Sequence, residues 1–358
     1  MSTLALVMAL SALLAWGVAA WVRRRAETLR LVQAPNHRSS HVQPTPNGGG
    51  LGIVVASSLA GVGLVLFSGW SLGWVVLGLA LLLAAVGLRD DVQHLPARVR
   101  FGVQVTVCAG LLLALGDMPG TSLTSAPLPE GEGFQVGGWV LSALLLLAGV
   151  WWINLFNFMD GIDGIAGSQA VFMLLAGAGL TTWGRPDVVA DPAWIWMLCI
   201  TAATVGFLLL NWPPAKIFMG DVGSTFLAFM IFALALVSVR AGWFSPLAGL
   251  AIWLILGAVF VVDATVTLLT RIARGERWYE AKFREAARRV EHGDQLGAQK
   301  IVDALLTLEP DCPLRDRLVQ PGYKRHKEYR VPEGEDGGYH GRVDQGRLLF
   351  THVGSARL

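Results

Sequence analysis

The chain has 358 residues, of which 54% are hydrophobic and only 15% are charged, and its mean hydropathy is +0.53. Soluble domains carry about 25% charged residues, so this composition excludes an ordinary soluble protein. The net charge of +2 excludes a strongly basic nucleic-acid-binding protein. Between Arg271 and Leu358 lie 17 of the 28 basic and 14 of the 26 acidic residues. This distribution indicates a membrane-embedded region followed by a polar tail.

Apolar runs recur along the chain before Arg271. A transmembrane helix needs about 20 apolar residues. Nine runs approach or reach that length, at residues 4–22, 49–67, 71–88, 101–116, 138–156, 166–183, 193–210, 225–239 and 246–270. They predict an all-α, polytopic helical bundle. The first run is followed by three arginines and has no basic residue before it, which predicts a retained anchor and not a signal peptide.

Lys and Arg are concentrated in alternate loops. The loops at 23–48 and 89–100 and the segment after the ninth run are basic, and the loop at 211–224 contains Lys216, whereas the loops on the opposite side contain only Arg185 and Arg240. Positively charged loops stay in the cytoplasm. We therefore predict an external N-terminus, an external loop at 117–137 and a cytoplasmic tail.

Acidic side chains lie where the predicted helices end on the cytoplasmic side. These residues are Asp90, Asp91, Asp160, Asp163 and Asp221. Carboxylates at a membrane boundary are costly to desolvate and usually mark function. Several converging acids would repel one another unless a cation lay among them, and oxygen ligands without a His/Cys cluster favour Mg²⁺ or Mn²⁺. The alternative interpretation is that they are ordinary solvated loop charges.

The segment from Asn154 to Gly164 combines amides with acids. Asn154, Asn157 and Asp160 are spaced by three residues, so they can line one face of a helix end. Asp163 follows Gly161, which lets the backbone turn. This face could bind a cation and a polar ligand together.

Two further segments carry groups that suit phosphate. Lys216 precedes Gly220-Asp221-Val-Gly-Ser224, which opens the eighth predicted helix, and helix N-termini attract anions. A simple cap by Ser224 is the alternative. The loop before the second predicted helix is basic, hydroxyl-rich and Gly-rich, although a Pro/Gly turn is the alternative there. Its candidate phosphate contacts are Asn36, Arg38, Ser39 and His41. Together these features predict a phosphorylated, Mg²⁺-dependent substrate at the cytoplasmic face and a second reactant in the membrane.

Taken in order, these motifs resemble the polyprenyl-phosphate N-acetylhexosamine-1-phosphate transferases of glycosyltransferase family 4. The resemblance extends from the first span to about Ala281 and is nearest to the bacterial branch that initiates O-antigen and related polysaccharides. It implies transfer of a sugar 1-phosphate from a UDP-N-acetylhexosamine to undecaprenyl phosphate, with release of UMP. It also implies a Mg²⁺ cofactor and a place in the bacterial inner membrane, in lipopolysaccharide and cell-envelope synthesis. No nucleic acid is implied as a partner, and the oligomeric state, a homodimer included, is left open.

The resemblance also implies residue roles. Asp90 and Asp91 match the paired catalytic aspartates, and Asp90 would activate the lipid phosphate. Asp221 and Asn157 match the metal-binding positions, and Asp163 matches a position near the uracil. The complete substrate-binding set is Asn154, Asp160, Asp163, Lys216, Gly220, Ser224, Asn36, Arg38, Ser39 and His41.

The chain departs from the family pattern at two places. Gln33 replaces a usual Asp, and after Ala281 neither the His-rich nucleotide-contacting loop nor a further span follows. We predict that Arg277 or Arg284 partly replaces the missing histidines, because arginine can bind a diphosphate bidentately. The departure also keeps a second hypothesis open, an inactive family member acting as a membrane scaffold through its tail. A transporter is disfavoured because a transporter is expected to have charged groups near the middle of the membrane, whereas Asp263 is the only acidic residue before Arg271 that lies inside a predicted span.

Three regions are predicted along the chain. Residues 1–275 form the membrane-embedded transferase core. Residues 276–310 alternate apolar and charged side chains with a helical period, which predicts an amphipathic helical hairpin. Residues 311–358 form a polar tail that is predicted to lack fixed structure.

Overall fold

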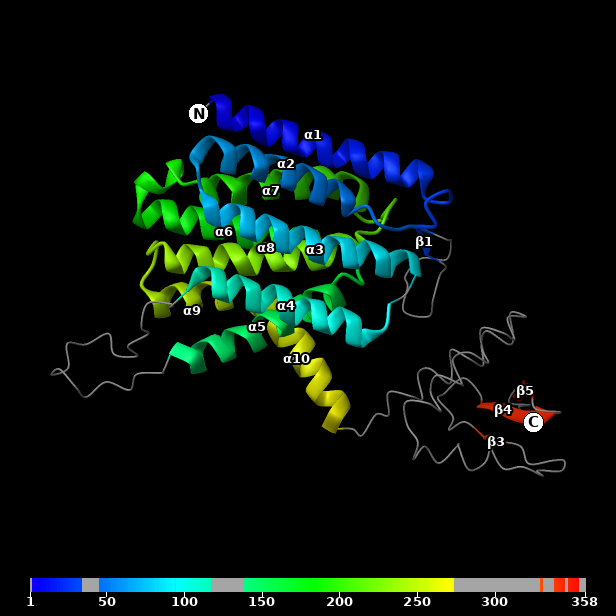
Figure 1. The fold of residues 1–358 in the computed structure, drawn as a ribbon. Helices are drawn as coiled ribbons and strands as arrows, with labels where there is room; N and C mark the ends of the chain where they lie inside the picture. The colour runs from blue at the N-terminus through cyan, green and yellow to red at the C-terminus, as the bar shows by residue number, and fades with distance from the viewer. Residues whose placement is uncertain are drawn as a thin grey trace. The chain divides into compact units, whose positions relative to one another are not determined.

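The computed structural model describes residues 2–33, 45–93, 95–116, 138–273, 329–330, 338–344 and 347–353. The chain divides into two compact units, Met1–Val266 and Thr267–Leu358. The described helices are α1 (Ser2–Arg25), α2 (Leu51–Ser68), α3 (Ser71–Gln93), α4 (Ala97–Leu115), α5 (Gly138–Met159), α6 (Ile165–Gly184), the 3-10 helix η1 (Pro186–Ala190), α7 (Pro192–Asn211), α8 (Gly220–Arg240), α9 (Pro246–Leu256) and α10 (Ala258–Ala273). The first unit is a helical bundle (Figure 1).

The apolar runs predicted from the sequence become long helices. Among the described residues, eight helices are long and apolar enough to cross a membrane, and α9 with α10 makes a ninth candidate. In a bilayer all backbone polar groups must be satisfied within the segment, which helices achieve. The predicted all-α polytopic fold is therefore confirmed.

The ninth candidate span is broken, whereas the sequence predicted one continuous run over 246–270. Its two halves meet at Gly257 with a bend of 64°. A break frees backbone carbonyls that must find other partners. The side-chain amide of Gln169 on α6 supplies one, since its Nε2 donates to the Leu256 carbonyl at 2.8 Å. A tertiary contact therefore helps to satisfy the break.

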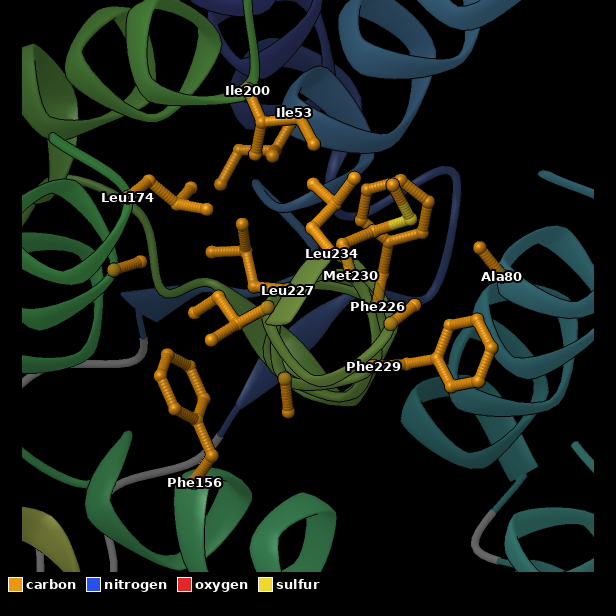
Figure 2. Close-up of a cluster of buried hydrophobic side chains, with 14 of the residues drawn as sticks. Ile53, Ala80, Phe156, Leu174, Ile200, Phe226, Leu227, Phe229, Met230 and Leu234 are labelled. Carbon is orange, nitrogen blue, oxygen red and sulfur yellow. The ribbon is translucent and has the colours of Figure 1, made fainter. Parts of the chain in front are cut away.

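Helix α8 is the centre of the bundle, and its residues from Val222 to Val239 are buried almost without exception. Figure 2 shows side chains of α8 meeting side chains from the surrounding helices α2, α3, α5, α6 and α7. Phe226 and Phe229 are fully buried, and so is Phe156 of α5. Close packing of this kind holds helices together where lipid competes for apolar surface. The first turn of α8 is thereby fixed relative to its neighbours.

A short extended segment joins the start of α2 to the start of α8. Strands β1 (Val32–Gln33) and β2 (Thr45–Pro46) pair antiparallel and bring the ends of the 34–44 loop together. The Pro46 carbonyl then accepts from the Phe218 backbone N–H at 2.8 Å, and Gly50 N donates to the Met219 carbonyl at 2.9 Å. These hydrogen bonds place the base of the loop beside the N-terminus of α8.

The second unit contains three antiparallel strands in the order β3 (Tyr329–Arg330), β4 (Gly338–Asp344) and β5 (Arg347–Val353). These strands lie in the 311–358 region, for which the sequence predicted no fixed structure, and the rest of that region lies outside the described residues. Aromatic and aliphatic residues such as Tyr339 and Phe350 favour strands. The boundary at 275/276 and the helical hairpin predicted at 276–310 lie outside the described residues.

Candidate functional site

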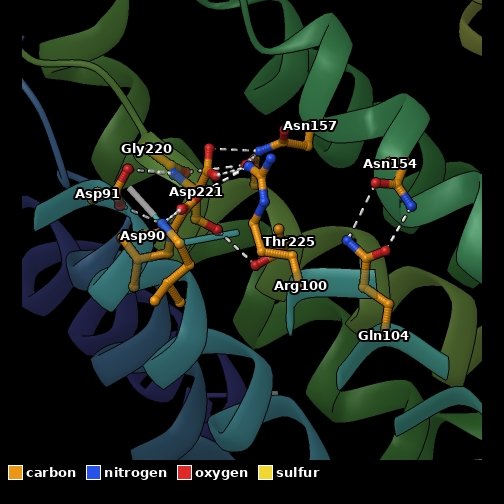
Figure 3. Close-up of polar contacts among 12 residues, drawn as sticks. Asp90, Asp91, Arg100, Gln104, Asn154, Asn157, Gly220, Asp221 and Thr225 are labelled. Carbon is orange, nitrogen blue, oxygen red and sulfur yellow. Dashed lines mark hydrogen bonds and ion pairs between the residues drawn. The ribbon is translucent and has the colours of Figure 1, made fainter. Parts of the chain in front are cut away.

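Four helix ends meet at one end of the bundle. The C-terminal turns of α3 and α5 and the N-terminal turns of α4 and α8 supply the polar side chains drawn in Figure 3. The sequence predicted that Asp90, Asp91, Asn157 and Asp221 share one face, and the structure brings these four together.

Asp221 lies in the first turn of α8, between a side chain of α5 and a side chain of α4. Its Oδ1 accepts from Asn157 Nδ2 of α5 at 2.8 Å, and the same amide nitrogen lies 2.8 Å from Ser224 Oγ. Its Oδ2 lies 3.5 Å from Arg100 Nη1 of α4. Asn157, Asp221 and Ser224 therefore form one connected set, with Asn157 orienting the Asp221 carboxylate.

Asp91 uses both carboxylate oxygens to cap the start of α8. Oδ1 accepts from the Asp221 backbone N–H at 2.9 Å, and Oδ2 accepts from the Val222 backbone N–H at 3.1 Å. Asn47 Nδ2 adds a third hydrogen bond, to Oδ1 at 3.0 Å. The first N–H groups of a helix lack intrahelical partners and favour a negative charge. Asp91 thus ties α3 to α8 and to the segment before α2.

Asp90 points to a different partner, because adjacent residues on a helix are turned by about 100° from each other. It is only 7% exposed. Its Oδ1 accepts from the Leu95 backbone N–H, and its Oδ2 lies 2.7 Å from Arg100 Nη1. The two adjacent aspartates therefore make separate sets of contacts, an ion pair for Asp90 and a helix cap for Asp91.

Arg100 is a site residue that the sequence reasoning missed. It entered that reasoning only as a topogenic charge in the 89–100 loop, yet its guanidinium lies between Asp90 and Asp221. Its position in the first turn of α4, ten residues after Asp90, was the available signal. A cation at that helix start faces the acids at the preceding helix end.

Gly220 acts through its backbone. Its φ of +77° is a left-handed conformation that favours glycine. A Cβ atom at this position would lie 2.7 Å from Asp91 Oδ2 and 2.8 Å from Asn47 Oδ1. Both distances are too short for non-bonded contact, so only glycine lets the α8 N-terminus approach its cap this closely.

The predicted amide and acid residues of the 154–164 segment have different surroundings. Asn154 exchanges two hydrogen bonds with Gln104 of α4, at 2.6 and 3.3 Å. Asp163 Oδ2 accepts from the Ala215 backbone N–H at 2.9 Å, which ties the α5–α6 turn to the loop before α8. Lys216 in that loop is exposed. Gln104, like Arg100, was not singled out from the sequence.

Asp160 lies just beyond α5, outside the membrane-spanning helices, and is partly buried. Burial raises the pKa of its carboxyl group well above the usual range, and the charges of Asp221 and Asp91 add to that rise. Burial and the neighbouring carboxylates of Asp221 and Asp91 thus disfavour a further negative charge at Asp160.

The donor chemistry of the site fits a hard divalent cation. Among the described residues, no three Asp, Glu, His or Cys side chains converge closely enough to form a complete metal cage. Mg²⁺, however, is usually bound by one or two carboxylates and completed by water and substrate phosphates. Asp221, together with the Asn157 amide oxygen, offers such a partial set of oxygen donors.

The predicted loop residues Asn36, Arg38, Ser39 and His41 and the predicted nucleotide contacts Arg277 and Arg284 lie outside the described residues. The β1–β2 pair nevertheless anchors both ends of that loop next to the start of α8.

Comparison with known proteins gives a consistent set of matches. Residues 73–239 match the model of glycosyl transferase family 4. A decaprenyl-phosphate N-acetylglucosaminephosphotransferase of Mycolicibacterium smegmatis is 35% identical over 294 residues, covering 76% of this chain and 70% of that protein. A probable undecaprenyl-phosphate N-acetylglucosaminyl 1-phosphate transferase of Bacillus subtilis is 30% identical over 251 residues, covering 70% and 67%. A phospho-N-acetylmuramoyl-pentapeptide-transferase of Synechococcus elongatus is 31% identical over 247 residues, covering 64% and 62%.

Proposed function

This chain belongs to glycosyl transferase family 4 and is a multi-pass membrane sugar-phosphate transferase, and from that premise we propose its specific reaction. The enzyme transfers an N-acetylhexosamine 1-phosphate from a UDP-sugar to a polyprenyl phosphate, with undecaprenyl phosphate as the expected acceptor, and releases UMP. The names of the similar proteins differ in the lipid and in the sugar, and what they share is transfer of a sugar phosphate in the N-acetylhexosamine class.

The observation that carries the proposal is the cluster of Asp90, Arg100, Asn157 and Asp221, drawn from four helices and lying inside the matched range. It combines carboxylates with a fixed guanidinium at the end of an apolar bundle. Such a site suits a diphosphate bound beside a lipid phosphate. The scaffold hypothesis gives no reason for four helices to converge on a cluster of partly buried charges.

In the proposed reaction a phosphate oxygen of the lipid attacks the phosphorus that carries the sugar. A new P–O–P bond forms, and the bond to the uridine phosphate breaks. Asp221 would hold Mg²⁺, with Asn157 orienting its carboxylate, and Asp90 would keep Arg100 in place beside the phosphates. When bound, Mg²⁺ neutralises the diphosphate and the developing charge. The second pKa of a phosphate monoester is about 6, so the lipid phosphate needs little help from Asp90 as a base.

The cellular setting extends the proposal. We place the site on the cytoplasmic side of the bacterial inner membrane, since the loops that flank it are the basic ones. There the product would start a lipid-linked glycan of the cell envelope, with O-antigen and lipopolysaccharide as the expected pathway.

The test is a reconstituted transfer reaction with the purified full-length protein. It is supplied with undecaprenyl or decaprenyl phosphate, Mg²⁺ and each of a panel of UDP-N-acetylhexosamines, and UMP release is measured. We expect UMP only when both a polyprenyl phosphate and one of the UDP-sugars are present. Absence of UMP with every sugar and both lipids, from folded protein, would overturn the proposal and favour the scaffold hypothesis.

A further inference from the structure

One nitrogen atom bridges the two carboxylates that flank the proposed metal site. Arg100 Nη1 lies 2.7 Å from Asp90 Oδ2 and 3.5 Å from Asp221 Oδ2. The first distance is that of a charge-assisted hydrogen bond, and the second is that of a loose ion pair. Arg100 is therefore anchored on Asp90 and only weakly held by Asp221.

The surroundings explain why a positive charge belongs there. Both oxygens of Asp91 are committed to the α8 backbone, so Asp91 has little capacity left for a cation. Carboxylates this close would repel one another without a counter-charge, and the Arg100 guanidinium supplies that charge between Asp90 and Asp221.

We infer that Arg100 is a positioning residue that serves as the internal counter-cation of the metal-free site and competes with the divalent cation for Asp221. The inference rests on the proposed metal role of Asp221. The guanidinium and the metal seek the same carboxylate, and two positive charges on adjacent ligand positions repel each other. Metal binding would therefore release the 3.5 Å contact to Asp221.

The contact to Asp90 would survive this exchange. Asp90 is the more buried partner, with a side-chain exposure of 8% against 28% for Asp221. A buried carboxylate that loses its partner is strongly destabilising, whereas a more exposed one can be solvated. Arg100 would thus stay anchored on α3 while Asp221 becomes free for the metal. The Arg100–Asp90 ion pair would therefore offset the negative charge of the carboxylates before the cation binds, and it would keep the guanidinium close to the site afterwards.

Metal affinity measured without substrates tests the inference directly. Mn²⁺ alone is titrated into the purified full-length protein, and free Mn²⁺ is followed by electron paramagnetic resonance. Two variants, Arg100→Gln and Arg100→Met, remove the competing charge. Because the second keeps an aliphatic stem, the test still works if one of the two variant proteins does not fold. Arg100→Lys keeps the charge. Arg98→Gln is the matched control, because it removes an exposed arginine of the same helix.

We expect Arg100→Gln and Arg100→Met to bind Mn²⁺ about tenfold more tightly than the wild type, a Coulomb effect reduced for the partial exposure of the pair. Arg100→Lys and Arg98→Gln should stay close to wild type. A merely structural role for Arg100 predicts unchanged or weaker Mn²⁺ binding in both uncharged variants, and that result would overturn the inference while leaving the metal site standing. If neither the wild type nor either uncharged variant binds Mn²⁺, the metal assignment itself fails and the inference fails with it.

Discussion

Asp221 is the residue on which the proposed metal role depends. Replacing it by Asn keeps the shape and an acceptor for Asn157 Nδ2 but removes the charge that would hold the cation. We expect UMP release to fall at least about 100-fold, since a bound metal supplies several kcal/mol of charge stabilisation. The protein should still purify as a folded species, but Mg²⁺ should no longer raise its melting temperature.

The matched control for this change is Asp187→Asn. Asp187 is an exposed carboxylate in η1, with 72% of its side chain accessible. Its loss should leave both UMP release and the Mg²⁺-dependent rise in melting temperature unchanged. Near wild-type transfer by Asp221→Asn at low Mg²⁺ would show that the metal is held elsewhere.

The two adjacent aspartates should respond differently to the same substitution. Asp91→Asn exchanges an acceptor of backbone N–H groups for an amide nitrogen that cannot accept them, so it should lower stability by about 1–3 kcal/mol. Asp90→Asn weakens the grip on Arg100 and should lower turnover more than it lowers the melting temperature. Thermal unfolding and UMP release, measured on both variants, check this division; equal effects in both assays would contradict it.

Asp160 gives the site a pH dependence whose sign can be worked out. Its pKa is raised in the folded state by burial and by the charges of Asp221 and Asp91, so the folded protein holds this proton more firmly than the unfolded chain does. Stability from this group is therefore lost as pH rises from about 4, the unfolded value, through the raised folded pKa. Asp160→Asn removes the titration.

In EDTA, we accordingly expect Asp160→Asn to melt at a higher temperature than the wild type above the folded pKa of Asp160. The difference should shrink as pH falls toward about 4 and vanish below it, where the wild-type carboxyl is protonated in both states. Melting curves across this pH range provide the measurement. A variant that is less stable than the wild type at high pH would contradict the assigned cause of the shift.

At the scale of elements, the junction of α3, α8 and the segment before α2 leaves no room at Gly220. Gly220→Ala places a Cβ 2.7 Å from Asp91 Oδ2 at a φ of +77°, so it should cost about 1–3 kcal/mol and displace the Asp221 carboxylate. Gly78→Ala is the control, because Gly78 lies inside α3 with open space around its Cα. That change should be neutral or slightly stabilising. Similar melting temperatures for the two variants would show that the close approach is not required.

Helix α8 also explains why the site is precise although its parts are far apart in sequence. Its buried side chains pack against seven neighbouring helices, so its first turn cannot shift independently. Asp221 and Ser224 are carried on that turn, and the Asp91 cap holds it from α3. A functional site built on packed helix ends keeps its geometry better than one built on loops.

For the whole molecule, the arrangement of helix ends at one side of the bundle makes a topology prediction. Ser40→Cys lies in the basic loop between α1 and α2, and Ser125→Cys lies in the loop between α4 and α5. In a background in which Cys312 is replaced, an impermeant thiol reagent should label Ser40→Cys only from the cytoplasm and Ser125→Cys only from outside. Cys108 and Cys199 are buried and should contribute little background. Opposite labelling would place the site on the external face.

Much of the fold could be predicted because a membrane span is a local property. Run length and hydropathy predicted the spans. The segments at 154–164 and 220–224 singled out Asn157 and Asp221, which the structure brings within hydrogen-bonding distance. Arg100 and Gln104 were missed because nothing next to them in sequence distinguishes them from other polar residues at the start of an apolar run. Their significance depends on which helix ends face them.

Composition, run length and short motifs were enough to predict the all-α polytopic class, the family resemblance and the set of carboxylates. How the carboxylates differ in use is visible only in the folded chain: Asp91 caps α8, Asp90 binds Arg100, and Asp221 lies between Asn157 and Arg100. The same is true of the bend in the ninth span, where Gln169 meets the Leu256 carbonyl. Each of these outcomes is a contact between residues distant along the chain, and the packing of helices around α8 sets which of them meet.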